Sequence, residues 1–153
     1  EAVRVIGSFN SESKFIDART GRETSVLLTA GRGYFVVGLV GVGQEPTDHA
    51  LKDIAAKAAE LEQWGRSIIL LFPDETAYAK YAASPAASLP QTVTFGIDRD
   101  GSVRRRILEA MQLPGNVSLP VFLIGDTFNR VVFESHGYTI GLGDRLLHTI
   151  HQL

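Results

Sequence analysis

The chain has 153 residues, of which 44% are hydrophobic and 21% charged, and its formal net charge is −2. This length suffices for one domain, residues 1–153, with a sizeable hydrophobic core. The small net charge gives no electrostatic reason to expect nucleic acid or an acidic membrane as a partner. The absence of cysteine excludes disulfides, thiolate catalysis and thiolate metal sites. No apolar run approaches the roughly 20 residues that span a bilayer, so we expect no membrane insertion by this segment.

The first predicted elements are an N-terminal β-hairpin and a buried strand. Phe15–Asp17 and Ser25–Leu27 flank a polar stretch that contains Gly21, a pattern typical of two strands joined by a turn. The segment Tyr34–Val42 is almost wholly apolar. Such a run predicts a strand that is covered on both faces of a sheet.

A long amphipathic helix is predicted after that strand. Pro46, Thr47 and Asp48 are residue types that begin helices, and Asp48 is the expected N-cap. We expect the helix to end at Gly65. One continuous apolar stripe with helical spacing runs along it, made of Leu51, Ile54, Ala55, Ala58 and Leu61.

The remaining segments complete an α/β pattern. A second buried strand, Ser67–Phe72, gives a βαβ unit with parallel strands and a right-handed crossover. A short helix, a third strand and another helix are predicted at Glu75–Ala83, Thr92–Ile97 and Ser102–Leu113. An antiparallel hairpin and a closing helix follow at Pro120–Gly125, Arg130–Ser135 and Leu142–His151. This order predicts a mixed central sheet with helices on both faces.

The order of elements, with Leu119-Pro120 opening the last hairpin, resembles the thioredoxin-like fold. The resemblance covers nearly the whole chain and is strongest to the extracytoplasmic thiol-disulfide reductases that are tethered to bacterial membranes. Its most specific part is Ser118–Asp126, which reads SLPVFLIGD, with Arg130–Val132 as the following strand and Gly137 as the family's glycine. The resemblance implies that Leu119-Pro120 is a cis peptide bond facing the start of the first long helix.

The family carries a Cys-x-Pro-Cys motif at the start of that helix, and this chain departs from it. Alignment of Pro46 with the proline of the motif puts Gln44 and Thr47 at the two cysteine positions and Glu45 between them. Gly43 then stands at the position of the usual tryptophan. Because disulfide exchange requires a thiolate that attacks sulfur, an amide and a hydroxyl cannot replace the cysteines. The resemblance therefore implies a degenerate redox site.

In redox-active relatives, the backbone beside the cis-proline pairs with an extended substrate peptide, a mode that needs no cysteine. By resemblance, Gly43, Leu119, Pro120 and Val121 would form such a cleft here. We expect a redox-inactive thioredoxin-like domain that acts as a protein-interaction or structural module. The alternatives are an enzyme that uses the cleft for non-thiol chemistry, a small-molecule or peptide binder, and a folded spacer.

A second resemblance concerns the setting of the domain. The stretch LPVFLIGDTFNRVVF, followed by GYTIGLG, is similar to the C-terminal thioredoxin-like domain of Bacteroidetes proteins that carry a transglutaminase-like domain upstream. It implies a module excised from a larger exported protein, located in the periplasm or cell envelope. The chain starts at Glu1 and has no signal-peptide pattern, which fits a mature or excised segment. Its partner would be a protein or peptide, or neighbouring domains of the same chain.

Several other features carry weaker functional hypotheses. Three glycines after the first buried strand suggest phosphate binding, but Pro46 stands where the dinucleotide fingerprint needs a glycine, so close packing explains them better. His49 could be a general base, yet no nucleophile accompanies it. His148 and His151 could share a metal ion, but lack a third ligand. The run Arg104–Arg106 spreads around its helix and forms no single patch. We predict no catalytic residue, no cofactor and no metal site.

Overall fold

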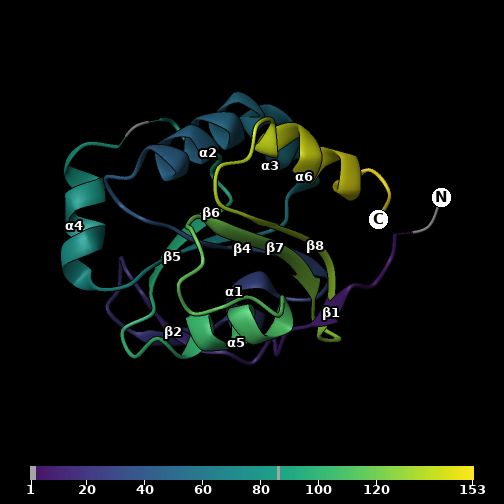
Figure 1. Ribbon diagram of the computed structural model, residues 1–153, viewed down its shortest axis with the longest axis horizontal. Helices are drawn as coiled ribbons and strands as arrows, with labels where there is room; N and C mark the ends of the chain where they lie inside the picture. The colour runs from purple at the N-terminus through teal and green to yellow at the C-terminus, as the bar shows by residue number, and fades with distance from the viewer. Residues whose placement is uncertain (1–2, 86) are drawn as a thin grey trace.

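The computed structural model describes residues 3–85 and 87–153, which form one eight-stranded mixed sheet with helices on both faces (Figure 1). The strands are β1 (Gly7–Ser8), β2 (Lys14–Asp17), β3 (Glu23–Ser25), β4 (Tyr34–Leu39), β5 (Ile68–Phe72), β6 (Val93–Ile97), β7 (Val121–Asp126) and β8 (Arg130–His136). The helices are α1 (Val26–Ala30), α2 (Glu45–Ala56), α3 (Ala58–Trp64), α4 (Glu75–Ala83), α5 (Ser102–Ala110) and α6 (Leu142–Ile150). The strand order is β1-β8-β7-β4-β5-β6-β2-β3.

The apolar central strands divide their side chains between two cores. In β4, Val36 belongs to one buried cluster, whereas Phe35 and Val37 belong to the other. Strand β5 alternates in the same way, with Leu70 on the first face and Ile69 on the second. Strands β4, β5 and β6 run parallel, while β7 runs antiparallel to β4. The prediction of a βαβ unit with doubly covered strands is confirmed.

The helices form a layer on each side of the sheet. Helices α2, α3 and α6 cover one face, α1 and α5 cover the other, and α4 flanks the sheet near the end of β5 (Figure 1). The predicted N-terminal hairpin is present as the antiparallel pair β2–β3, and β2 also pairs with β6. The predicted mixed sheet, with helices on both faces and an N-terminal hairpin, is therefore confirmed.

The segment that follows the hairpin differs from the prediction. Ser25–Leu27 was expected to be a strand, but only Glu23–Ser25 is extended and the chain then enters helix α1. The hydroxyl of Ser25 accepts a hydrogen bond from the N–H of Leu28, which is the geometry of a helix N-cap. Val26 is fully buried at the start of this short helix. A capping serine thus overrides the strand preference of the residue that follows it.

The long amphipathic helix is two helices rather than one, and it starts earlier than predicted. Gln44, not Asp48, is the N-cap residue, and the helical run is interrupted at Lys57. The apolar stripe nevertheless stays buried across the break, since Leu51 and Leu61 both belong to the same core. Gly65 ends α3 in a left-handed conformation, as predicted.

Two helix or strand ends also differ, and one short strand is additional. β4 stops at Leu39 instead of Val42, because the N–H of Gly41 turns to the side chain of Thr47 and leaves the sheet. Helix α5 stops at Ala110 instead of Leu113, where Gln112 adopts a positive φ of 54°. The two-residue strand β1, which pairs with the edge of β8, was not predicted.

Candidate functional site

The first part of the candidate site is the turn between β4 and α2. Gly43 has a φ of 77°, a left-handed conformation that favours glycine, and Gln44 then begins the helix without a side-chain cap bond. Thr47 is only 2% exposed, and its Oγ1 accepts a hydrogen bond of 2.9 Å from the N–H of Gly41. Thr47, which the resemblance predicts at the second cysteine position, therefore closes the turn from inside. Gln44, predicted at the first cysteine position, lies on the surface.

The second part is the segment that leads into β7. Leu119-Pro120 is a cis peptide bond, as the resemblance implies. Pro120 is buried, and its carbonyl accepts a hydrogen bond of 2.9 Å from the N–H of Gly137. Val121 pairs with Leu39, the last residue of β4, so this segment lies at the same end of the sheet as the turn that precedes α2.

Leu119 has free main-chain groups at this end of the sheet. Within residues 3–85 and 87–153, neither its N–H nor its carbonyl has a protein hydrogen-bond partner. The residue as a whole is half-buried. A backbone polar group needs a partner, either water or another chain. Leu119 can therefore pair with an incoming segment.

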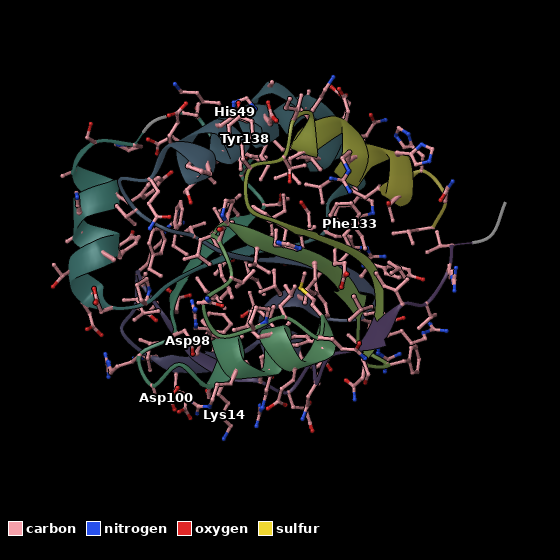
Figure 2. The ribbon with its side chains drawn as sticks, in the orientation of Figure 1. Lys14, His49, Asp98, Asp100, Phe133 and Tyr138 are labelled. Atoms are coloured by element: carbon pink, nitrogen blue, oxygen red, sulfur yellow. The ribbon has the colours of Figure 1, made fainter. Side chains whose placement is uncertain are left out.

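A third segment, residues 137–141, joins the first two and was not identified from the sequence as part of a site. Gly137 bonds to Pro120 as described above, while the ring of Tyr138 stacks on the ring of His49 in α2 (Figure 2). Tyr138 is 54% exposed and Ile140 is 79% exposed. The sequence signal was an aromatic and a β-branched residue in a glycine-flanked loop after a strand, which is too common to single out.

Two hollows border these segments. One, of about 310 Å³, is lined mainly by apolar side chains, among them Leu39, Leu71 and Leu119, with Asp98 and Arg104 at its polar side. The other, of about 360 Å³, extends from the turn before α2 toward α4 and includes Thr47, Lys80 and Tyr81. A further hollow, of about 540 Å³, lies elsewhere, between β2 and α5. The hollows of about 310 and 360 Å³ therefore lie beside Leu119 and the turn, and the one of about 540 Å³ does not.

The buried polar groups near these hollows already have structural partners. Asp98 lies at the start of α5 (Figure 2), and its two carboxylate oxygens accept the N–H groups of Val103 and Arg104 at 3.1 and 2.8 Å. The pKa of Tyr81 is raised above 10.0, chiefly because burial disfavours the phenolate. Asp98 thus caps α5, and its position after a strand and before a helix could have signalled this role in the sequence.

The remaining candidates from the sequence are dispersed. His49 does not face a nucleophile: its Nε2 lies 3.6 Å from Oδ2 of Asp53, one turn further along α2. Residues Arg104–Arg106 bond to three different places, namely the carbonyl of Gly115, the carbonyl of Asp100 and the hydroxyl of Ser13, so the prediction that they form no single patch is confirmed. His148 is 3.4 Å from the side-chain amide of Gln152, the only polar contact recorded for it within the described residues.

Two further observations concern metal ions and membranes. In the part of the chain that the structure describes, no group of three or more His, Asp or Glu side chains is close enough to hold a metal ion. Over the same residues, no helix has the length and apolar character needed to cross a bilayer.

The glycines at the end of the first buried strand were predicted to serve close packing, and the structure gives the reason for Gly38, which lies within β4. A Cβ on Gly38 would lie 2.4 Å from the ring of Phe122, which crosses β4 at this point. The absent side chain thus makes room for an aromatic ring of β7.

Comparison with known proteins bears on the architecture of the chain. No protein-family model matches the sequence, and no curated protein matches it either. Among solved structures, a protein of Chlorobium tepidum assigned as the thiol:disulfide interchange protein DsbE superposes with a TM-score of 0.68 and 15% identity, covering 95% of this chain and 96% of its own. BsSco, a member of the Sco family of cytochrome c oxidase assembly proteins, gives a TM-score of 0.69 and 12% identity over 99% and 97%.

A bacterioferritin comigratory protein from Xanthomonas campestris with alkyl peroxide reduction activity gives a TM-score of 0.71 and 14% identity, over 97% of this chain and 98% of its own. Identities this low bear on architecture alone. The strand order, the cis-proline before β7 and these superpositions agree, and the chain has the thioredoxin-like fold.

Proposed function

We propose that this thioredoxin-like domain has no thiol chemistry and binds an extended protein or peptide segment beside Leu119. The observation that carries the proposal is the free N–H and carbonyl of Leu119, next to the cis-proline and at the same sheet end as the turn before α2. An extended segment could pair with these groups as an added strand, because main-chain hydrogen bonds supply the affinity in that mode. Gly43, Pro120 and Val121 would shape the cleft around it.

The absence of redox activity follows from the chemistry of the vacated motif. Thr47 uses its hydroxyl to hold the turn, and Gln44 offers an amide; neither group can attack a disulfide. We expect no catalysed reduction of insulin by this protein. Reduction of insulin at a rate above the reagent background would contradict this part of the proposal.

The proposed setting for such a role is a larger extracytoplasmic protein. This setting is supported by the resemblance to reductases of the bacterial envelope and by the names of two structural neighbours, DsbE and a Sco-family assembly protein. In this proposal the domain is one module of an exported chain that also carries a transglutaminase-like domain. The bound segment then comes either from a neighbouring module or from a separate protein.

A second candidate function is the binding of a small molecule. The hollow of about 310 Å³ beside Leu119 is lined mainly by apolar side chains and has a few polar groups at one side, which is the usual make-up of a ligand pocket. A small apolar ligand would fill this hollow without using the main chain of Leu119. The two functions therefore differ in their response to substitutions on the open surface of the cleft.

The test begins with a phage-displayed library of random dodecapeptides and measures the affinity of one selected peptide. Glu45→Arg and Leu119→Arg should each weaken binding by about tenfold or more. Leu28→Arg is the matched control for Leu119→Arg: Leu28 is 78% exposed on α1, so it gains the same single charge away from the cleft. All three variants should melt within a few degrees of the parent protein. Failure to select any peptide, or equal loss with Leu28→Arg, would favour a folded spacer.

A further inference from the structure

His49 lies where α2 meets the loop 137–141. Its side chain is half-buried, and its ring stacks on the ring of Tyr138 with centroids 4.8 Å apart and planes tilted by 22° (Figure 2). His49 comes from the second turn of α2, whereas Tyr138 comes from the loop between β8 and α6. The stack therefore fastens the loop to the helix that begins at the vacated motif.

The carboxylate of Asp53 connects the same two regions. Its Oδ2 lies 3.6 Å from Nε2 of His49 and accepts the N–H of Leu142, the first residue of α6, at 3.1 Å. Nε2 of His49 is shielded from solvent, and within the described residues it has no hydrogen-bond partner. A distance of 3.6 Å is too long for a hydrogen bond but short enough for an ion pair. Nε2 thus faces a carboxylate across a gap that a small side-chain rotation would close.

One more charged pair lies on this face, one turn further along the helix. Lys57 forms an ion pair of 3.1 Å with Asp144 of α6, and this contact raises the pKa of Lys57. On its own helix His49 has Asp53 four residues ahead, with Glu45 four residues before it and Lys52 three residues after it at exposed positions. The ring of Tyr138 faces His49 from the loop, while Lys57 and Asp144 neutralise each other nearby.

Protonation of His49 would strengthen both of its contacts. An imidazolium donates a charge-assisted hydrogen bond to a carboxylate, which is stronger than the bond from a neutral ring. It also gains a cation–π attraction to the face of a tyrosine ring. Histidine is the side chain that changes charge near neutral pH, so both contacts would strengthen as the solution becomes mildly acidic.

We propose that His49, Asp53 and Tyr138 form an acid-strengthened clasp that holds the loop 137–141 against α2 and so regulates the peptide cleft. Gly137 of this loop donates to the carbonyl of Pro120, and the exposed side chains of Tyr138 and Ile140 stand on the loop beside it. A tighter clasp would order the loop that bonds to Pro120 before a peptide arrives. Because peptide binding then has to order less of the loop, the affinity for the peptide rises as the pH falls. The regulatory part rests on the proposed function above.

The clasp itself is tested without any ligand. Amide and ring resonances of residues 137–142 are followed by NMR between about pH 5.5 and about pH 8, together with the ring protons of His49. In the parent protein the loop resonances should shift with the same midpoint as His49, and the exchange protection of these amides, corrected for intrinsic rates, should rise at the acid end. His49→Gln and Asp53→Asn should abolish or reduce the response. His148→Gln, at an exposed position on α6, is the control and should leave it intact.

The regulatory consequence is tested with the peptide selected from the library. Its affinity for the parent protein should rise about fivefold between the alkaline and acid ends, and this gain should disappear in His49→Gln. A loop that does not follow His49, or that responds equally in His49→Gln, overturns the clasp. A loop that responds while affinity stays constant overturns the regulation and leaves the proposed function in place. If no peptide binds at any pH, the proposed function and the regulation are both wrong. The pH response of the loop resonances then shows by itself whether the clasp exists.

Discussion

The crossing of α6 over α2 should be sensitive to a single methyl group at Gly143. A Cβ at this position would lie 2.6 Å from the carbonyl oxygen of Asp53 and 2.8 Å from Cγ of Lys57. The oxygen belongs to the backbone of α2, so no flexible side chain can move aside. The helices would have to separate by more than half an ångström, an order-of-magnitude reading of the distance below ordinary van der Waals contact.

Separation is costly because α6 is anchored on the core. Its inward side chains are buried in the same cluster as those of α2 and the sheet: Leu142, Leu146, Leu147 and Ile150. Overpacking of this kind costs about 3 kcal/mol at its upper range, and the better helix propensity of alanine returns about 1 kcal/mol. We therefore expect Gly143→Ala to lower the free energy of unfolding by about 2 kcal/mol and the melting temperature by roughly 4–8 °C.

Chemical denaturation and calorimetry of purified protein measure both quantities. Gly115→Ala is the control, because a Cβ there meets nothing within 4 Å and its φ is not positive; it should be neutral or slightly stabilising. A Gly143→Ala protein that melts within about 1 °C of the parent would show that α2 and α6 separate freely and that the reasoning is wrong. The loop resonances of this variant would also show whether the clasp depends on the helix crossing.

Substitutions at three further positions test how the site is held. Thr47→Val should cost about 1–3 kcal/mol, because it removes the buried acceptor of the Gly41 N–H, and Thr47→Ser should cost less; equal midpoints in urea for the two variants would contradict this. Asp98→Ala should cost about 2 kcal/mol through two lost N–H bonds at the start of α5, again measured in urea, and an unchanged midpoint would remove its capping role. The raised pKa of Tyr81 means that the folded protein holds the phenolic proton more tightly than the unfolded chain. Its stabilising effect is therefore complete below about pH 10 and is lost as pH rises through the folded-state pKa. Tyr81→Phe should flatten the decline of melting temperature between about pH 9 and about pH 11, and an unaltered decline would argue against the shift.

Much of the architecture could be predicted because its signals are local and strong. The apolar runs around Val36 and Leu70 indicate strands covered on both faces, since they have strand length and are rich in β-branched residues and leucine. Gly65 marks a helix end because glycine accepts the left-handed conformation without steric cost. The order of these elements, together with Leu119-Pro120, then indicated the thioredoxin-like fold.

Other features depend on contacts between residues that are distant in the sequence. Val26 has strand propensity, yet the cap formed by Ser25 and burial under the sheet place it in a helix. The interruption at Lys57 coincides with the place where Gly143 of α6 packs against α2, and no helix-breaking residue marks it. Strand β1 has only two residues and exists because the edge of β8 offers it hydrogen bonds.

One part of the candidate site could be predicted from the sequence, and the other part depends on tertiary contacts. The sequence by itself determined that the motif positions 44 and 47 carry no thiol, because composition alone decides that chemistry. Only the tertiary structure decided that Thr47 became a structural acceptor and that Leu119 keeps free main-chain groups. It also decided that His49 meets Tyr138, a pair separated by most of the chain. Contacts of this kind arise from the packing of α6 and its preceding loop onto α2, and no local sequence pattern in either segment predicts that the two will be in contact.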